Sequence, residues 1–340
     1  GCEIVISPNG SPFDKYKRSE RITIINSRVK ESGLPFLYVN QVGGQDELVF
    51  DGSSLIVNPD ATIIEQGPCW EESFLVAEYN KESSKFLGDK IDFKESNALE
   101  EIYMATVIGL RDYVVKNNFP GVILGLSGGI DSSVVSTICA MTGKKTFAVS
   151  MPIQQNQKQH NLSLKHQEWL KNYKNIVTPI ISLDNIFKNF QTTLSKFNSL
   201  QGFANLRSRL RMVTLYQVAQ SNNGIVVGTG NKVEDFGVGF FTKYGDGGID
   251  IAPIADCTKT EVWEMGRELG ILKEIIDAIP TDGLWNDARS DENQLGLSYK
   301  QIEAAMNNSN SKYYKKYLKI RTLSLHKMKP IPVCKIKDKR

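Results

Sequence analysis

The first 80 residues alternate short apolar runs with polar turns, a pattern typical of strands around a single helix. Glu3–Ser7 and Pro35–Asn40 predict strands, and the segment between them predicts a helix over about Lys15–Glu31. Further strands, with a turn at Asn58–Asp60, are expected at Leu48–Phe50, Ser54–Val57, Thr62–Ile64 and Phe74–Ala77. We therefore expect a first domain over residues 1–80 and a polar linker over 81–97, which is rich in Lys, Glu, Ser and Asp.

Helices and strands alternate from Ala98 onward, which predicts a second domain over residues 98–340. A helix at Ala98–Lys116 is followed by apolar strands expected at Val122–Leu126, Thr146–Ser150, Ile176–Ile181 and Ile225–Thr229. Helices are expected between these strands, over Ser132–Met141, about Leu162–Asn172 and about Phe203–Ser221. Such alternation predicts an α/β fold with a doubly wound parallel sheet and a ligand at the carboxyl ends of the strands.

The turn after the first of these strands has the composition of a phosphate-binding loop. The strand stops at Ser127-Gly128-Gly129, and the chain resumes as a helix near Ser132. Glycines let backbone N–H groups approach a ligand closely, and the helix N-terminus adds positive potential. Asp131 lies at the mouth of this loop, where its carboxylate would repel phosphates unless a divalent cation lay between them. The sequence therefore implies Mg²⁺, and the loop lacks the GxxxxGK[ST] pattern of a Walker A motif.

Composition places the chain among ordinary globular proteins. It has 340 residues, 41% hydrophobic and 23% charged, enough for two domains. No apolar run approaches the roughly 20 residues that span a membrane, and no signal-peptide pattern opens the chain. The five cysteines are scattered without a metal-binding spacing, so we expect reduced thiols, a cytoplasmic protein and no zinc site. Since the first residue is Gly1 rather than Met, we expect a processed chain or part of a longer one.

Positive charge is concentrated at the C-terminal end. Residues 311–340 carry nine lysines, two arginines and one aspartate, whereas the whole chain has a net charge of only +3. A basic tail interleaved with Tyr313, Tyr314 and Tyr317 is one feature of nucleic-acid binding. The alternatives are a solvated helix end or a flap that touches the phosphates of a small ligand. Because the rest of the chain is acidic, we expect no nucleic acid as a partner.

Two further features favour anion chemistry near the predicted sheet. Arg207, Arg209 and Arg211 lie on the long helix, with Arg207 and Arg211 on one face and Leu206, Leu210 and Val213 as the buried stripe. The loop after the fourth strand, from Thr229 to Gly248, is rich in glycine and acid. Glu234 in that loop is a candidate second carboxylate that would share a cation with Asp131. Without further support, these side chains would be ordinary surface charges.

The support comes from a family resemblance. Ser127–Ser133 resembles the loop of ATP pyrophosphatases, which activate an oxygen with AMP before an amine attacks, as in synthetases for GMP, asparagine, argininosuccinate and NAD. Three segments together look like NAD⁺ synthetase: Arg209–Met212, Gly239–Gly248 and Ser290–Gly296. The resemblance covers about residues 98–330 and implies an adenine nucleotide alpha hydrolase-like sheet. It further implies ATP-dependent amidation of deamido-NAD⁺ through an adenylylated intermediate, giving NAD⁺, AMP and pyrophosphate.

The resemblance also implies roles for single residues. Asp131, Glu234, Lys259 and Thr281 would be catalytic, and Asp131 with Glu234 would hold Mg²⁺. The ATP-binding set would be Gly125, Leu126, Ser127, Gly128, Gly129, Ile130, Asp131, Ser132, Thr229, Lys259 and Thr281. The deamido-NAD⁺-binding set would be Arg209, Lys243, Asp250, His326 and Lys327. Family members assemble as dimers or larger complexes, so a homo-oligomer is expected.

The first half resembles the C-terminal part of a nitrilase-like glutaminase domain, which precedes the synthetase in glutamine-dependent NAD⁺ synthetases. The matching segments are Glu3–Phe13 and Tyr38–Gly52. Family glutaminases use a Glu, Lys and Cys triad that lies upstream of this segment, and Cys2 stands where a small core residue is usual. We therefore expect the full-length protein to take ammonia from glutamine and this chain alone to need free ammonia.

Three function classes account for these features to different extents. An ATP-dependent amide ligase accounts for both carboxylates, Lys259 and the Phe240–Gly248 run, which also separates this chain from GMP synthetase. A nitrilase-type amidohydrolase is suggested only by residues 1–80, where the triad is missing. A non-catalytic nucleotide-binding module would need the phosphate loop but neither Glu234 nor Lys259.

Overall fold

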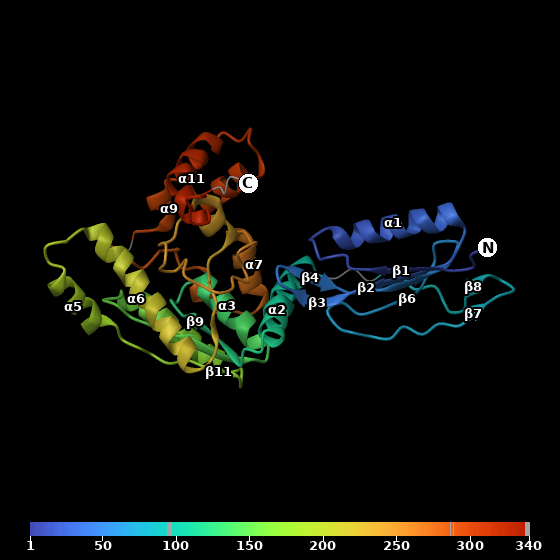
Figure 1. The fold of residues 1–340 in the computed structure, drawn as a ribbon, viewed down its shortest axis with the longest axis horizontal. Helices are drawn as coiled ribbons and strands as arrows, with labels where there is room; N and C mark the ends of the chain where they lie inside the picture. The colour runs from blue at the N-terminus through green and yellow to red at the C-terminus, as the bar shows by residue number, and fades with distance from the viewer. Residues whose placement is uncertain (94–96, 286, 288, 337–340) are drawn as a thin grey trace. The chain divides into compact units, whose positions relative to one another are not determined.

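The computed structural model describes residues 1–93, 97–285, 287 and 289–336. Two compact units form: Gly1–Phe119 with Met141–Gly143, and Pro120–Ala140 with Lys144–Arg340. The expected linker and basic tail include residues 94–96 and 337–340, which lie outside the described residues. Figure 1 traces the chain through both units.

The first unit is built on a four-stranded sheet with the order β1-β2-β5-β6, in which β1 and β2 are parallel and the other pairs antiparallel. Its elements are β1 (Val5–Asn9), α1 (Lys17–Ser32), β2 (Phe36–Asn40), β3 (Val42–Gln45), β4 (Leu48–Asp51), β5 (Leu55–Val57), β6 (Ile63–Gln66), β7 (Tyr79–Asn80), β8 (Lys85–Phe86) and α2 (Ala98–Lys116). Helix α1 lies along one face of the sheet, where Ile25 and Val29 pack against Tyr38, Leu55 and Val57 (Figure 1).

The strand expected at Phe74–Ala77 is not formed. Leu75 and Ala77 pack beside Ile56 and Phe86 on the second face of the sheet, whereas Phe74 is 98% exposed. The run of four apolar residues predicted a strand, but none of the described strands pairs with this segment. The packing of Leu75 and Ala77 therefore holds this segment in place without backbone hydrogen bonds to a neighbouring strand in the part of the chain that the structure describes.

The second unit contains the parallel sheet. Its elements are β9 (Gly121–Gly125), α3 (Ile130–Met141), β10 (Lys145–Val149), α4 (Gln157–Leu170), β11 (Ile176–Val177), α5 (Asp184–Thr193), α6 (Leu200–Ser221), β12 (Ile225–Val226), η1 (Lys232–Val238), α7 (Lys259–Glu268), α8 (Lys273–Ile276), α9 (Asp291–Leu295), α10 (Tyr299–Asn307) and α11 (Tyr314–Met328). The strand order β11-β10-β9-β12 is parallel throughout, which confirms the predicted α/β class. Strands β11 and β12 are shorter than expected.

The strand order reverses beside β9. From β9 the chain proceeds to β10 and β11 on one side, and it returns to β12 on the other. Crevices at the carboxyl ends of strands at such a switch point are where open α/β sheets bind ligands. The phosphate loop follows β9, and the acidic loop with Glu234 follows β12, so the topology brings the two candidate loops together.

The core of this unit lies between the sheet and α5 and α6. Ile123, Val149 and Val226 of the sheet pack with Phe187 and Ala219 of the helices. The stripe predicted on α6 is partly wrong, because Leu206 and Leu210 pack there but Val213 is 58% exposed. None of the helices in the described part of the chain has the length and apolar character needed to cross a membrane.

A buried histidine joins α4 to the helix that follows the phosphate loop. His166 is fully buried, its Nε2 lies 3.0 Å from Ser136 Oγ of α3, and its ring stacks on Trp169. Burial lowers the pKa of His166 to about 4. In the unfolded chain the histidine pKa is near 6.5. Between pH 4 and about 6.5, therefore, His166 is protonated in the unfolded chain but neutral in the folded one.

We expect this group to destabilise the fold as the pH falls from about 6.5 to 4, by roughly 3 kcal/mol in total. Urea unfolding of the wild type and of His166→Gln at pH 7.5 and 4.5 measures the effect. The wild type should lose stability relative to the variant at the lower pH, since glutamine does not titrate. If the free energies of unfolding of the two proteins changed equally with pH, His166 would not be the cause of the loss.

Candidate active site

A cavity of about 630 Å³ lies in the second unit at the carboxyl ends of β9 and β12. The phosphate loop, helix α6, the segment Phe240–Ile249 and the segment Ala278–Trp285 contribute to its walls. Charged side chains of both signs face it, including Asp131, Glu234 and Lys259. The site predicted from two separated loops is thus one continuous cavity.

The phosphate loop is braced by its own serines. Ser127 N–H donates to Ser132 Oγ at 3.2 Å, the two hydroxyls lie 2.9 Å apart, and Gly129 N–H donates to Ser127 Oγ. Gly128 has φ +87°, and a Cβ there would lie 2.7 Å from the carbonyl oxygen of Gln159. Only glycine fits this position without moving α4. A ligand phosphate would therefore meet a preformed loop at the start of α3.

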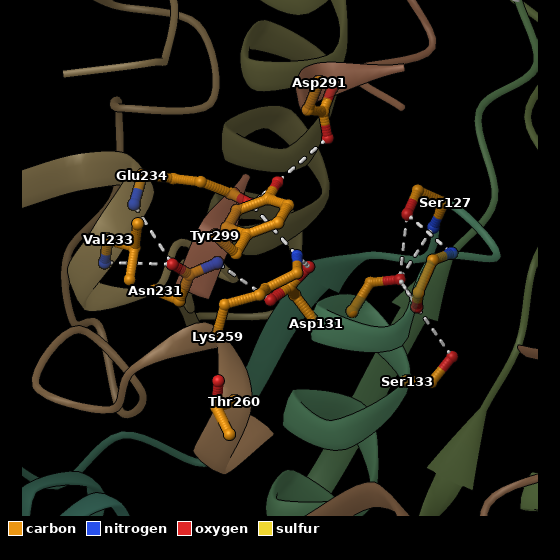
Figure 2. A network of polar contacts seen from close by, with 12 residues as sticks. Ser127, Asp131, Ser133, Asn231, Val233, Glu234, Lys259, Thr260, Asp291 and Tyr299 are labelled. Carbon is orange, nitrogen blue, oxygen red and sulfur yellow. Dashed lines mark hydrogen bonds and ion pairs between the residues drawn. The ribbon is translucent and has the colours of Figure 1, made fainter. Parts of the chain in front are cut away.

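Lys259 lies between the two predicted carboxylates. Its Nζ is 2.5 Å from Asp131 Oδ2 and 3.0 Å from Glu234 Oε1, and the side chain is 2% exposed (Figure 2). Lys259 is the first residue of α7, whose start is fixed by a capping box of Thr258 and Glu261. The geometry differs from the sequence-based picture, in which a metal ion alone joined the carboxylates. In this structure an ammonium group lies between them and offsets one of their two negative charges.

The three charges shift one another's pKa values. Burial would lower the pKa of Lys259, but Asp131 and Glu234 together raise it well above its usual range, so the ammonium stays charged. Burial raises the pKa of Asp131, against the opposing charge of Lys259. Burial acts on Glu234 in the same direction, but the Lys259 charge and the Tyr299 hydrogen bond outweigh it and lower its pKa. Perturbed, buried groups facing one cavity are typical of an active site.

Three neighbours of this centre were not predicted from the sequence. Asn231 is fully buried, accepts from Glu234 N–H and donates from Nδ2 to Asp131 Oδ1 at 3.0 Å. Tyr299 donates to Glu234 Oε1 at 2.6 Å, and Asp291 Oδ2 lies 3.2 Å from the same hydroxyl. Asn231 stands three residues before Glu234, a helix-capping spacing that could have singled it out.

Asp291 has an unusual environment. Its side chain is 5% exposed and lines the cavity, and its Oδ1 has no hydrogen-bond partner among the described residues. Burial, followed by the Glu234 charge, raises the pKa of Asp291 to about 7. A carboxyl group that changes charge near neutral pH therefore stands on the cavity wall.

Most of the predicted site residues line this one cavity. From the ATP and metal sets these are Gly125, Leu126, Ser127, Gly128, Gly129, Ile130, Asp131, Thr229, Glu234, Lys259 and Thr281. From the deamido-NAD⁺ set they are Arg209, Lys243, His326 and Lys327. Within the described part of the chain, Ser132 and Asp250 do not line it. Ser132 braces the loop from inside, and Asp250 accepts from the Tyr216 hydroxyl and from Val226 N–H.

The basic side chains that line the cavity donate hydrogen bonds to backbone carbonyl oxygens. Arg209 donates to the carbonyl of Lys243, and Lys243 donates to the carbonyl of His326 at 3.2 Å. Arg211 donates to the carbonyl of Met151, and burial lowers its pKa to about 10. Among the described residues, Arg209, Arg211 and Lys243 form no ion pair with a carboxylate, so positive groups on the cavity wall remain without an acidic partner. Such a wall suits an anionic ligand.

The two carboxylates in the cavity have the chemistry of ligands for a divalent cation. Asp131 and Glu234 both line the cavity and already enclose one positive charge. The described residues contain no group of three or more His, Cys, Asp or Glu side chains that could hold a metal ion by themselves. One or two carboxylates completed by phosphate oxygens are the usual Mg²⁺ site of nucleotide enzymes. The residues present therefore match a cation that arrives with a nucleotide.

A serine- and glycine-rich loop at the switch point of a parallel sheet, with paired carboxylates beside it, defines a nucleotide-binding protein of the doubly wound α/β class. Residues 102–337 match the family model described as NAD synthase, and residues 1–86 match that of carbon-nitrogen hydrolase. The chain belongs to the NAD synthase family. Its first unit carries part of a carbon-nitrogen hydrolase domain.

Individual proteins agree with this placement. The glutamine-dependent NAD(+) synthetase of Synechocystis sp. is 34% identical over 81% of this chain and 50% of its own length. The structure of the glutamine-dependent NAD+ synthetase of Acinetobacter baumannii with ADP is 28% identical, with a TM-score of 0.75 over 97% of this chain and 65% of that one. NMN synthetase of Francisella tularensis is 32% identical, with a TM-score of 0.65 over 72% of this chain and all of that one. The chain spans about half the length of the curated glutamine-dependent relatives that it matches.

Proposed function

We propose that this chain catalyses the ATP-dependent amidation of deamido-NAD⁺ to NAD⁺, with AMP and pyrophosphate as the other products. The observation that carries the proposal is the Asp131–Lys259–Glu234 centre beside the phosphate loop in one cavity. The family match and the NAD+ synthetases among the relatives support the same reaction. The nicotinate carboxylate would attack the α-phosphate of ATP, and ammonia would then displace AMP from the adenylylated carbonyl.

Each part of the cavity has a role in this reaction. The loop at Ser127–Gly129 and the start of α3 would bind the leaving pyrophosphate. Lys259 would offset negative charge that develops on the phosphoryl oxygens. Arg209, Lys243, His326 and Lys327 would hold the anionic dinucleotide on the basic side, and Thr229 and Thr281 would contact ATP. Asp131 and Glu234 would hold Mg²⁺, which when bound spreads the charge of the phosphates.

Free ammonia is the proposed nitrogen donor for this chain alone. The first unit contains Cys2 and Cys69 as its thiols, and neither has the environment of an activated nucleophile. Burial raises the pKa of Cys69, which opposes thiolate formation, and the Cys2 thiol donates to the carbonyl of Ile4. In a full-length protein, glutamine would supply the ammonia.

A second candidate substrate is nicotinate mononucleotide. The similarity to NMN synthetase over that protein's entire length favours it, because the same chemistry on the mononucleotide acid would give NMN. Both substrates carry the same nicotinate carboxylate, so the phosphate loop and the charged centre would serve either. The two candidates differ in how much of the basic wall the substrate occupies.

One assay tests the function and separates the substrates. The chain is incubated with ATP, Mg²⁺ and either deamido-NAD⁺ or nicotinate mononucleotide, with ammonium or glutamine, and AMP and the amide product are quantified. We expect NAD⁺ from deamido-NAD⁺ with ammonium and none with glutamine. Product from the mononucleotide alone would replace the first substrate by the second, and NAD⁺ from glutamine would refute the ammonia requirement.

We further propose that the protein is a cytoplasmic homo-oligomer. The five cysteines form no disulfide, which agrees with a reducing compartment. Exposed apolar side chains on and after α5, namely Ile186, Phe190, Phe197 and Leu200, support self-association.

A further inference from the structure

Tyr299 occupies a constrained position behind the charged centre. It is the first residue of α10, is 1% exposed, and its backbone N–H donates to Glu292 Oε1 at 2.9 Å. A capping box of Ser298 and Gln301 fixes the start of the helix. Trp263 of α7 meets the ring edge-on, with centroids 5.6 Å apart. Backbone, cap and ring contacts therefore leave this side chain little freedom.

The hydroxyl and the ring of Tyr299 contact different members of the centre. The hydroxyl donates to Glu234 Oε1 at 2.6 Å, and burial together with Glu234 raises the pKa of Tyr299 far above its usual range, so the donor keeps its proton. The ring centroid lies 5.0 Å from Lys259 Nζ, a cation–π distance. Figure 2 shows the ring alongside Lys259 with its hydroxyl at the Glu234 carboxylate.

We propose that Tyr299 is the positioning residue of the active centre, whose hydroxyl orients the Glu234 carboxylate toward the cation that accompanies ATP. This proposal rests on the proposed function of the site. Glu234 belongs to the π-helical turn η1, and its carboxylate is approached by two donors, Lys259 and Tyr299. Lys259 is also bonded to Asp131, and the Tyr299 hydroxyl also lies 3.2 Å from Asp291, but the shorter contact of that hydroxyl, at 2.6 Å, is to Glu234.

Packing alone does not explain this arrangement. Tyr317 is buried in the same apolar cluster and contacts Tyr314 through its ring. In the described residues it makes no side-chain hydrogen bond to Asp131, Glu234 or Lys259. A phenylalanine would satisfy the apolar cluster at position 299 as well. The hydroxyl of Tyr299 instead serves a carboxylate on the cavity wall, and partners that orient metal-binding side chains affect affinity or activity by about 10- to 100-fold.

The test removes only the hydroxyl. Tyr299→Phe keeps the ring, and with it the contacts to Lys259 and Trp263, and Tyr317→Phe is the control for loss of a tyrosine hydroxyl from the same apolar cluster. Binding of Mn²⁺, in place of Mg²⁺, is measured by electron paramagnetic resonance in the presence of ATP and without a second substrate. We expect Tyr299→Phe to bind Mn²⁺ about 10- to 100-fold more weakly, with Tyr317→Phe like the wild type.

Two further measurements separate positioning from general destabilisation. Binding of ATP without divalent cation should be unchanged in Tyr299→Phe. The thermal midpoints of Tyr299→Phe, Glu234→Ala and the double variant should be non-additive, because each single change removes one partner of the same hydrogen bond. Additive midpoints, or wild-type Mn²⁺ affinity in Tyr299→Phe, would overturn the proposal.

The outcome is independent of the identity of the second substrate. If the wild type binds Mn²⁺ with ATP but makes no NAD⁺, the proposed function is refuted. The Mn²⁺ affinities of Tyr299→Phe and Tyr317→Phe still test the role of Tyr299 in that case. A wild type that binds no Mn²⁺ with ATP overturns the positioning role together with the cation site.

Discussion

Replacing Asp131 with asparagine should lower kcat for ammonia-dependent NAD⁺ formation on the order of 10²- to 10³-fold. The amide keeps the shape of the side chain and can still meet Asn231, but it removes a charge that faces both Lys259 and the proposed cation. Because burial already raises the pKa of Asp131, the neutral side chain should fold without a large loss of stability. Release of AMP at saturating ATP and Mg²⁺ measures the effect.

A control distinguishes this loss from the removal of any negative charge. Asp256 is largely exposed and pairs with Lys232 at the surface, so Asp256→Asn should retain nearly full activity. An Asp131→Asn enzyme with wild-type kcat would refute the role of this carboxylate. A change confined to KM for ATP would show that Asp131 acts in ground-state binding and not in the chemical step.

The sheet and the phosphate loop could be predicted because local sequence determines them. Apolar runs such as Val122–Leu126 have few alternatives to a buried strand, and glycines after such a run allow few structures other than a tight loop. The segment Phe74–Ala77 shows the limit of this reasoning. Its run of apolar residues is typical of a strand, but pairing depends on a neighbour that the local pattern does not specify.

The centre itself depends on contacts between distant residues. Lys259 is 128 residues from Asp131, and Tyr299 is 65 residues from Glu234. Spacing in the sequence cannot show that an ammonium group lies between the carboxylates or that a tyrosine orients one of them. The family resemblance implied roles for Asp131, Glu234 and Lys259 individually. Only the structure shows how these three side chains contact one another and that Asn231 and Tyr299 contact them.

Replacing Lys259 with methionine should destabilise the second unit by about 3–5 kcal/mol at pH 8, since it leaves two largely buried carboxylates without their shared cation. The loss should shrink at lower pH. Without Lys259 the folded-state pKa of one carboxyl rises above its unfolded value, so the folded chain takes up a proton and regains stability as the pH falls toward 5. Urea unfolding at pH 8 and pH 5.5 measures this, and Lys232→Met, at an exposed pair, should cost less than about 1 kcal/mol.

The same variant tests whether Lys259 and a divalent cation compete for one place. In the wild type the ammonium already lies between Asp131 and Glu234 and offsets one of their two charges, so Mg²⁺ without nucleotide should raise the thermal midpoint less than in the variant. In Lys259→Met the carboxylates face each other unpaired, and Mg²⁺ should stabilise the fold by mass action and restore part of the lost midpoint. Turnover should remain low even so, because Lys259 is also the group that would offset charge on the phosphates. Equal Mg²⁺ shifts in both proteins would show that the cation binds elsewhere.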